Sequence, residues 1–176
     1  DVEIISFKNQ YKYLLKKMLK EYLVFTANFL EEKPWNCCID IKYELAKTFD
    51  YLQEFKPPNG EILVAIFNNK LIGTTSLKMI RNNASELKRM FVEPYFQGKK
   101  IGQLLLNKAI EKSIEFGACE MYLESPPPCK KAHKLYKKNG FKIIKEYPEV
   151  SIPSQLKIDW IYMKNSNFKS EYKKLV

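Results

Sequence analysis

Hydrophobic residues recur every three or four positions in two segments of the N-terminal third of the chain. The spacing predicts helices over residues 10–30 and 39–55. Pro34 ends the first segment, and the cluster Pro57, Pro58, Asn59 and Gly60 ends the second. A short β-rich stretch at residues 2–7 precedes both and predicts a first strand. Two helices are therefore expected before the main run of strands.

Beyond residue 60 the chain favours strands and helices in turn. The β-rich runs at residues 62–67 and 71–80 predict a hairpin, and residues 86–92 a further strand ended by Pro94. Residues 101–116 and 128–139 predict helices, the first with one apolar and one charged face. Short strands are predicted at residues 121–124, 141–145 and 158–163. The expected fold class is a single α/β (α+β) domain over residues 1–165, with a mixed, mostly antiparallel sheet of about seven strands, about four flanking helices and a polar tail at 166–176.

Composition limits the classes of protein that fit. The chain has 176 residues, of which 45% are hydrophobic and 28% charged, enough for a core that needs neither disulfides nor a metal. The four cysteines, at 37, 38, 119 and 129, form no C-x-x-C pair, and His133 is the one histidine, so no metal site is predicted. No apolar run reaches the roughly 18 residues of a membrane span. We expect reduced thiols, no membrane partner and a cytoplasmic location.

The net charge of +10 favours a polyanionic partner. Nucleic acid is disfavoured, because the lysines are spread along the chain and Arg81 and Arg89 are the only arginines, although arginine reads bases better than lysine does. A phosphorylated cofactor and an ordinary solvated lysine surface both stay open.

The most informative stretch is residues 90–102, where a strand passes through a short turn into a helix. Backbone N–H groups converge at such a turn, and the helix dipole makes it attractive to phosphate. Gly98 permits an unusual backbone angle, and Gly102 permits close approach at the first helical turn. Lys99 and Lys100 add positive charge. The pattern predicts an anion cradle, with an ordinary glycine-containing turn as the alternative.

Two motifs resemble signatures of the GNAT superfamily of acyl-CoA-dependent N-acetyltransferases. The run VEPYFQGKKIG at residues 92–102 looks like the pyrophosphate motif of that family, and AHKLYKKNGF at residues 132–141 looks like its second signature. The resemblance extends from about residue 62 to 163. It implies the GNAT-like fold, with seven strands and four helices, and acetyl-CoA as co-substrate.

The resemblance also implies which residues contact the cofactor. The expected set is Met90, Phe91, Val92, Gln97, Gly98, Lys99, Lys100, Ile101, Gly102 and Cys129. Lys100 stands where the family usually has glycine, and Cys129 where many members have asparagine. A separate argument supports an open strand edge beside Met90 and Val92, because Pro126, Pro127 and Pro128 follow the next strand and can supply no ladder N–H groups.

Tyr136 and Glu86 are the candidate catalytic residues. By the resemblance, Tyr136 lies beside the cofactor sulfur and protonates the departing thiolate, whereas its spacing alone favours an ordinary core aromatic residue. Period-two alternation puts Glu86 on the same strand face as Lys88, Met90 and Val92, where a carboxylate could act as general base. A surface ion pair with Lys88 or Arg89 is the alternative for Glu86.

The sequence therefore predicts an N-acetyltransferase that moves an acetyl group from acetyl-CoA to a primary amine of a small molecule or peptide, by direct nucleophilic attack. The alternative is a non-catalytic acyl-CoA-binding or nucleic-acid-binding module on the same fold. Nothing in the sequence identifies the acceptor amine. A homodimer is also kept as an expectation.

Overall fold

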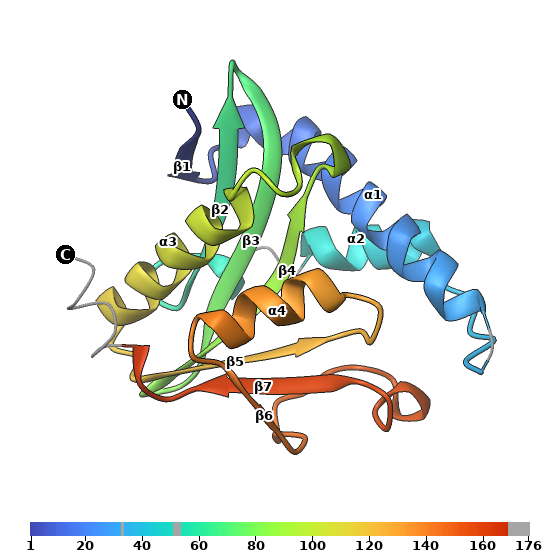
Figure 1. Ribbon diagram of the computed structural model, residues 1–176. Coiled ribbons are helices and arrows are strands. Elements are labelled where there is room, and N and C mark those ends of the chain that lie inside the picture. Colours follow the sequence, from blue (N-terminus) through green and yellow to red (C-terminus); the bar gives the residue numbers. More distant parts are fainter. Residues whose placement is uncertain (33, 51–53, 169–176) are drawn as a thin grey trace.

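A seven-stranded sheet forms the centre of the molecule in the computed structural model, which describes residues 1–32, 34–50 and 54–168 (Figure 1). The strands are β1 (Glu3–Ser6), β2 (Gly60–Phe67), β3 (Lys70–Arg81), β4 (Ala84–Val92), β5 (Glu120–Ser125), β6 (Lys142–Ile144) and β7 (Ile161–Asn165). Their order across the sheet is β1-β2-β3-β4-β5-β7-β6. Only β4 and β5 pair in parallel, and the other neighbours are antiparallel. The predicted fold class, a single domain with a mostly antiparallel sheet, is confirmed.

Four α-helices cover the two faces of the sheet. They are α1 (Lys12–Glu31), α2 (Ile41–Asp50), α3 (Ile101–Glu115) and α4 (Lys130–Lys138). In Figure 1, α3 and α4 lie in front of the sheet, and α1 and α2 lie at its other side. The helix α3 connects the parallel strands β4 and β5, as a parallel crossover requires.

The hydrophobic core is likewise divided between the two faces of the sheet. Buried residues of α3, including Leu105, Leu106 and Ala109, pack with Leu63 and Leu77 on one face. On the other face, the buried face of α1 packs against β2 and β3, and the C-terminal end of α1 packs against β5, β7 and the segment around Tyr147. Of the apolar positions that the three-four spacing of residues 10–30 predicted, Leu15, Met18 and Leu19 are buried, whereas Leu14 and Phe25 are exposed.

The predicted boundaries differ from the observed ones by small amounts. Three residues of 3-10 helix, Asn9–Tyr11, precede α1, and the predicted helix at 39–55 is observed as α2, with residues 51–53 outside the described residues. The last predicted strand, 158–163, is observed at Ile161–Asn165, because the chain still turns before Trp160.

The region predicted as a polar tail begins in contact with the core. Phe168 is only 1% exposed and belongs to the cluster beneath α3. An apolar side chain buried this fully stabilises a fold by about 2–3 kcal/mol. Phe168, in the predicted tail at 166–176, therefore packs on the core, and residues 169–176 lie outside the described residues.

Candidate active site

The strands β4 and β5 separate along their length. Their parallel pairing runs from Ala84 opposite Glu120 to Leu87 opposite Leu123 and then stops, although β4 continues to Val92 and β5 to Ser125. The prolines at 126–128 follow β5 directly, as the sequence argument required. Among the described residues, the later half of β4 therefore has a ladder partner on one side only, β3. The prediction that these two strands part is confirmed.

A bulge in β4 changes which face its side chains occupy. Against β3, Thr74 pairs with Phe91 but Ser76 pairs with Lys88, so one extra residue is inserted on β4. Arg89 lies in the bulge with φ of 52°, in the left-handed region. The insertion interrupts period-two alternation between Lys88 and Met90.

Glu86 therefore does not share a face with Met90 and Val92, and that prediction is wrong. Met90 and Val92 pack against the cluster that contains α3. Glu86 contacts Tyr147, which belongs to the cluster packed against the end of α1. Two faces of β4 thus carry the two sets of candidate residues, and we name them the α3 face and the α1 face.

The turn from Gln97 to Gly102 connects β4 to α3 and has a left-handed backbone at two positions. Gly98 has φ of 80° and Lys100 has φ of 65°. Lys100 is the N-cap residue of α3, and its conformation costs a non-glycine residue about 1–2 kcal/mol. The amide of Gln97 donates from Nε2 to the carbonyl of Val92 over 3.1 Å, which ties the turn to the end of β4. Lys99 lies over the ring of Tyr95, with Nζ 4.2 Å from its centroid.

Three other residues of the predicted cofactor set have packing roles. Ile101 is 2% exposed, so its side chain belongs to the core. A Cβ on Gly102 would lie 3.3 Å from Leu135 Cδ2, so Gly102 permits close packing of α3 on α4. Phe91 packs against Tyr22 of α1, with ring centroids 6.0 Å apart. Ile101 and Phe91 can therefore meet a ligand mainly through their backbones.

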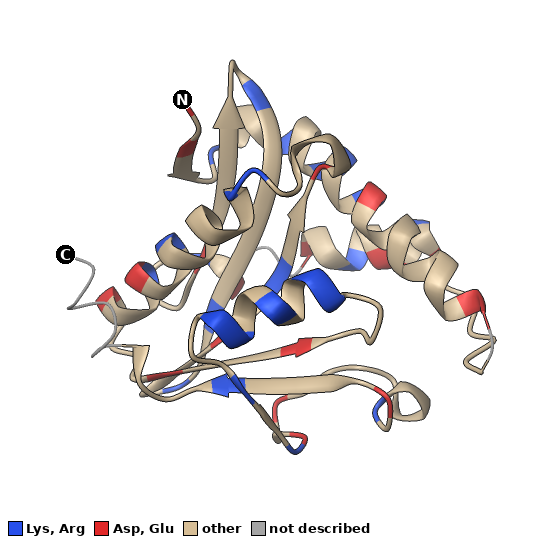
Figure 2. Cartoon of the chain, viewed as in Figure 1, with Lys and Arg blue, Asp and Glu red and all other residues tan. Residues whose placement is uncertain are grey.

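Lysines concentrate on α4, which carries no acidic residue (Figure 2). Five of its nine residues are lysines, at positions 130, 131, 134, 137 and 138. The prediction that the lysines are dispersed is wrong for this segment, because these five lie within nine consecutive residues and share one short helix. Such a helix attracts anions through its side chains.

Tyr136 of α4 reaches the α3 face of β4. It is 6% exposed, and its hydroxyl donates to Met90 Sδ over 3.5 Å. Burial raises the pKa of this phenol well above its ordinary value, so it stays protonated. A thioether sulfur is a weak acceptor, so the hydroxyl remains available to a better one.

Cys129 and His133 lie at the N-terminal end of α4 beside the end of β5. Cys129 occupies the N-cap position, and burial raises the pKa of its thiol. His133 Nε2 lies 2.9 Å from Ser125 Oγ. Burial, followed by the charge of Lys137, lowers the pKa of the imidazole. Both groups are therefore neutral near pH 7.

Glu86 is fully buried on the α1 face. Its Oε1 accepts a hydrogen bond of 2.6 Å from the Tyr147 hydroxyl and lies 3.1 Å from Lys88 Nζ. Lys88 also lies 3.6 Å from Glu124 Oε1. The second oxygen, Oε2, is buried without a hydrogen-bond partner. The ion pair with Lys88 that the sequence allowed is present, but it is buried rather than on the surface.

The sequence did not indicate that Tyr147 and Glu124 lie beside Glu86 and Lys88. Tyr147 is 61 residues from Glu86 and lies in an irregular segment, where no periodicity marks a side chain as inward. Glu124 is on β5, and its place beside Lys88 depends on the register between two strands separated by a helix. Burial and the charge of Glu86 raise the pKa of the Tyr147 phenol, which keeps the hydroxyl a donor.

The described residues contain no cluster of three or more His, Cys, Asp or Glu side chains that could hold a metal ion. Nor does any helix in the described part of the chain have the length and hydrophobicity to cross a membrane.

Comparison with known proteins agrees with the fold and the motifs. The model of the Acetyltransferase (GNAT) family matches residues 25–141. An uncharacterized N-acetyltransferase of Schizosaccharomyces pombe is 30% identical over 143 residues, which cover 80% of this chain and 86% of the relative. A spermidine N(1)-acetyltransferase of Thermoplasma acidophilum is 37% identical over 83 residues, or 46% of this chain and 50% of that protein. The crystal structure of a GNAT-family acetyltransferase from Staphylococcus aureus Mu50 superposes with a TM-score of 0.74 at 27% identity, covering 94% of this chain and 98% of that one.

The chain therefore belongs to the GNAT family of acetyltransferases. It is an N-acetyltransferase that uses acetyl-CoA as its co-substrate. The predictions of family, enzyme class and cofactor are confirmed.

Proposed function

We propose that acetyl-CoA lies along the open edge of β4, with its pyrophosphate at the turn before α3, and that a primary amine attacks the acetyl carbon directly from the α1 face. The observation that carries this proposal is the end of β4–β5 pairing after Leu87, at the point where Tyr136 reaches Met90. The backbone beyond Leu87 can pair with the amide groups of the pantetheine arm, as an added strand would.

The turn supports the place proposed for the pyrophosphate. Gly98 and Lys100 both adopt positive φ immediately before the first turn of α3, where the N–H groups of a helix have no internal partners. Backbone N–H groups in this arrangement bind phosphate oxygens. Lys99 and Lys100 add charge at the same place, so Lys100 can substitute for the usual glycine without loss of the donors.

Proton movements assign the two catalytic roles. The attacking ammonium must lose a proton before its nitrogen can attack, and Glu86 is a carboxylate beside the parting strands that can accept one, directly or through water. The departing CoA thiolate must gain a proton, and Tyr136 holds one at the open edge of β4. A C–N bond forms at the acetyl carbon and the C–S bond breaks. The nitrogen then gives up its second proton, which returns to Tyr136 directly or through water, so the products are the acetylated amine and CoA thiol. The first proton leaves Glu86 to solvent.

The test compares CoA with pantetheine, which lacks both the phosphates and the adenosine of CoA. CoA should raise the melting temperature by mass action, and pantetheine, which lacks the phosphates, should do so far less. Lys100→Glu should remove most of the CoA shift, because it puts negative charge at the turn. Lys142→Glu, on the exposed edge strand β6, changes the net charge equally and should leave the shift intact. Equal shifts from CoA and pantetheine would contradict the phosphate assignment.

We also propose a cytoplasmic location and, as a separate proposal, a homodimer. The thiols of Cys37, Cys38 and Cys129 are not in disulfides, which suits a reducing compartment. Ile143, 59% exposed on the edge strand β6, could pair with a second copy. Cell fractionation tests the first proposal, and sedimentation of the wild type against Ile143→Lys tests the second.

A further inference from the structure

Arg89 carries a positive charge that the described protein does not pair. Its Nη1 atom is completely enclosed and has no hydrogen-bond partner. No carboxylate of the described residues lies within ion-pair distance of the guanidinium, whereas the neighbouring Lys88 has both Glu86 and Glu124. Burial lowers the pKa of Arg89, but a guanidinium remains protonated at any working pH. An enclosed charge without a partner raises the free energy of the folded protein, and binding of an anion beside it removes this cost.

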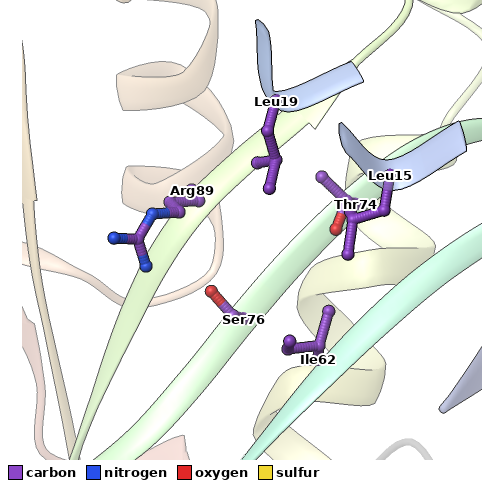
Figure 3. A pocket seen from close by; sticks show the side chains of 6 residues that line it. All are labelled: Leu15, Leu19, Ile62, Thr74, Ser76 and Arg89. Atoms are coloured by element: carbon purple, nitrogen blue, oxygen red, sulfur yellow. The ribbon is translucent and has the colours of Figure 1, made fainter. Parts of the chain in front are cut away.

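The guanidinium occupies a defined place on the α1 face. Its Cζ lies 5.3 Å from the centroid of the Phe55 ring, which supports one face of the planar group. Figure 3 shows the guanidinium turned away from Leu15, Leu19 and Ile62, the apolar side chains that line a small cavity beneath α1. The charged end is therefore directed out of the apolar cavity, while its stem helps to close it.

The position along β4 connects this charge to the reaction. Arg89 lies in the bulge, one residue before Met90 and two residues after the last residue of β4 that pairs with β5. The bulge keeps Arg89 on the α1 face beside Lys88, whereas Met90 turns to the α3 face. An amine that approaches the open edge from the α1 face would pass this guanidinium.

We propose that Arg89 binds a carboxylate of the acceptor, so that the acceptor is an amino acid or another amine that carries a carboxylate. This inference rests on the proposed function, because it uses the same open edge and the same direction of attack. A guanidinium presents paired N–H donors that match the two oxygens of a carboxylate. The carboxylates of Glu86 and Glu124 interact electrostatically with Arg89. Positive and negative side chains therefore lie next to each other on the α1 face. An ammonium and a carboxylate on one small molecule match that arrangement, whereas the two acidic residues oppose a phosphate dianion.

The experiment measures kcat/KM for a panel of α-amino acids, the amide of each, and spermidine. The wild type should favour the acids over their amides by at least about tenfold, because one charged hydrogen-bonded pair is at stake. Arg89→Met should lower kcat/KM for the acids about 30-fold or more and change it little for the amides. Arg89→Lys should be intermediate, since lysine keeps the charge but loses the paired donors. Arg81→Met is the matched control, because Arg81 is paired with Glu149 at 2.8 Å on the surface.

A binding measurement tests the same inference in variants whose turnover changes for another reason. In the presence of CoA, N-acetylated amino acids should raise the melting temperature of the wild type more than their amides do, and Arg89→Met should remove that difference. Equal kcat/KM for acids and amides in the wild type, or an equal loss for both in Arg89→Met, would overturn the carboxylate inference and leave the acetyltransferase function standing. A preference for spermidine over every amino acid would overturn it as well. The CoA-against-pantetheine comparison tests the proposed cofactor site separately, because Arg89 lies outside the turn before α3.

Discussion

The two faces of β4 are built in different ways. On the α3 face the candidate groups are mainly backbone: the unpaired edge of β4, the left-handed turn and the first turn of α3. Tyr136 is the candidate catalytic side chain there, and its hydroxyl reaches Met90. On the α1 face they are side chains: Glu86, Lys88 and Arg89 from β4 with Tyr147 and Glu124 from elsewhere. A backbone site suits a co-substrate common to a whole family. A side-chain site suits an acceptor that differs between members.

The bulge at Arg89 makes this division possible. Without the inserted residue, alternation would place Glu86 and Met90 on one face, and the charged cluster would compete with the apolar packing of α3 for the same space. With it, two consecutive charged residues, Lys88 and Arg89, face α1, and the apolar Met90 faces α3. The left-handed backbone of Arg89 costs about 1–2 kcal/mol, which packing on both faces of β4 offsets.

The strongest test of the α1 face is Glu86→Gln. The amide keeps the size of the side chain but cannot accept the amine proton, so we expect turnover at neutral pH to fall about 100-fold or more. Part of the loss should recover at high pH, where more of the acceptor is already unprotonated. A pH–rate profile of kcat measures this, with Glu149→Gln, a surface partner of Arg81, as control. The same fractional loss at every pH would point to damaged binding instead of a lost base.

Tyr136→Phe tests the α3 face. It retains the ring that packs on Phe141 and removes only the hydroxyl that donates to Met90. Turnover should fall about 10- to 100-fold, while the free energy of unfolding should change by about 1 kcal/mol or less. Steady-state kinetics and urea unfolding measure the two effects. Tyr122→Phe, whose hydroxyl bonds Glu120, is the control for loss of a buried phenol. Unchanged turnover would make Tyr136 a core aromatic residue only.

Tyr147→Phe should have a smaller effect. The pKa of this phenol is raised, so in the wild type it stays protonated and donates to Glu86 across the working pH range. Its loss removes the hydrogen bond that holds Glu86 Oε1 and leaves the contact with Lys88, so turnover should fall only a few-fold. Steady-state kinetics measure this. A loss as large as that of Glu86→Gln would mean that Tyr147 does more than hold the carboxylate in place.

Lys100→Gly should give the smallest effect. Glycine removes the left-handed strain of about 1–2 kcal/mol but makes the unfolded chain more flexible, so we expect a net gain in the free energy of unfolding of about 1 kcal/mol or less. Gly98→Ala is the matched counterpart: a Cβ there meets open space, yet φ of 80° disfavours alanine, so stability should fall by about 1 kcal/mol. Urea unfolding measures both. A loss of stability in Lys100→Gly would mean that the lysine side chain stabilises the turn.

The sequence alone determined most of the fold and the backbone features of the α3 face. In the described residues, β-rich runs located every strand and three-four spacing located every α-helix to within a few residues, because residue type and local apolar patterning favour one element over the other. The turn before α3 and the parting of β4 from β5 could also be predicted, since glycine and proline restrict the backbone where they stand, whatever lies around them. These features depend on neighbours in the chain.

Only the tertiary structure decided how the α1 face is built. The bulge that turns Glu86 and Met90 to opposite faces depends on the register with β3, and no residue type in residues 84–92 marks it, because Arg89 is not a glycine. The hydroxyl of Tyr147 meets Glu86 across 61 residues through an irregular segment. Nη1 of Arg89 lacks a hydrogen-bond partner only because packing encloses this atom without a carboxylate at contact. Such contacts are decided when distant segments pack together, and local spacing carries no signal for them.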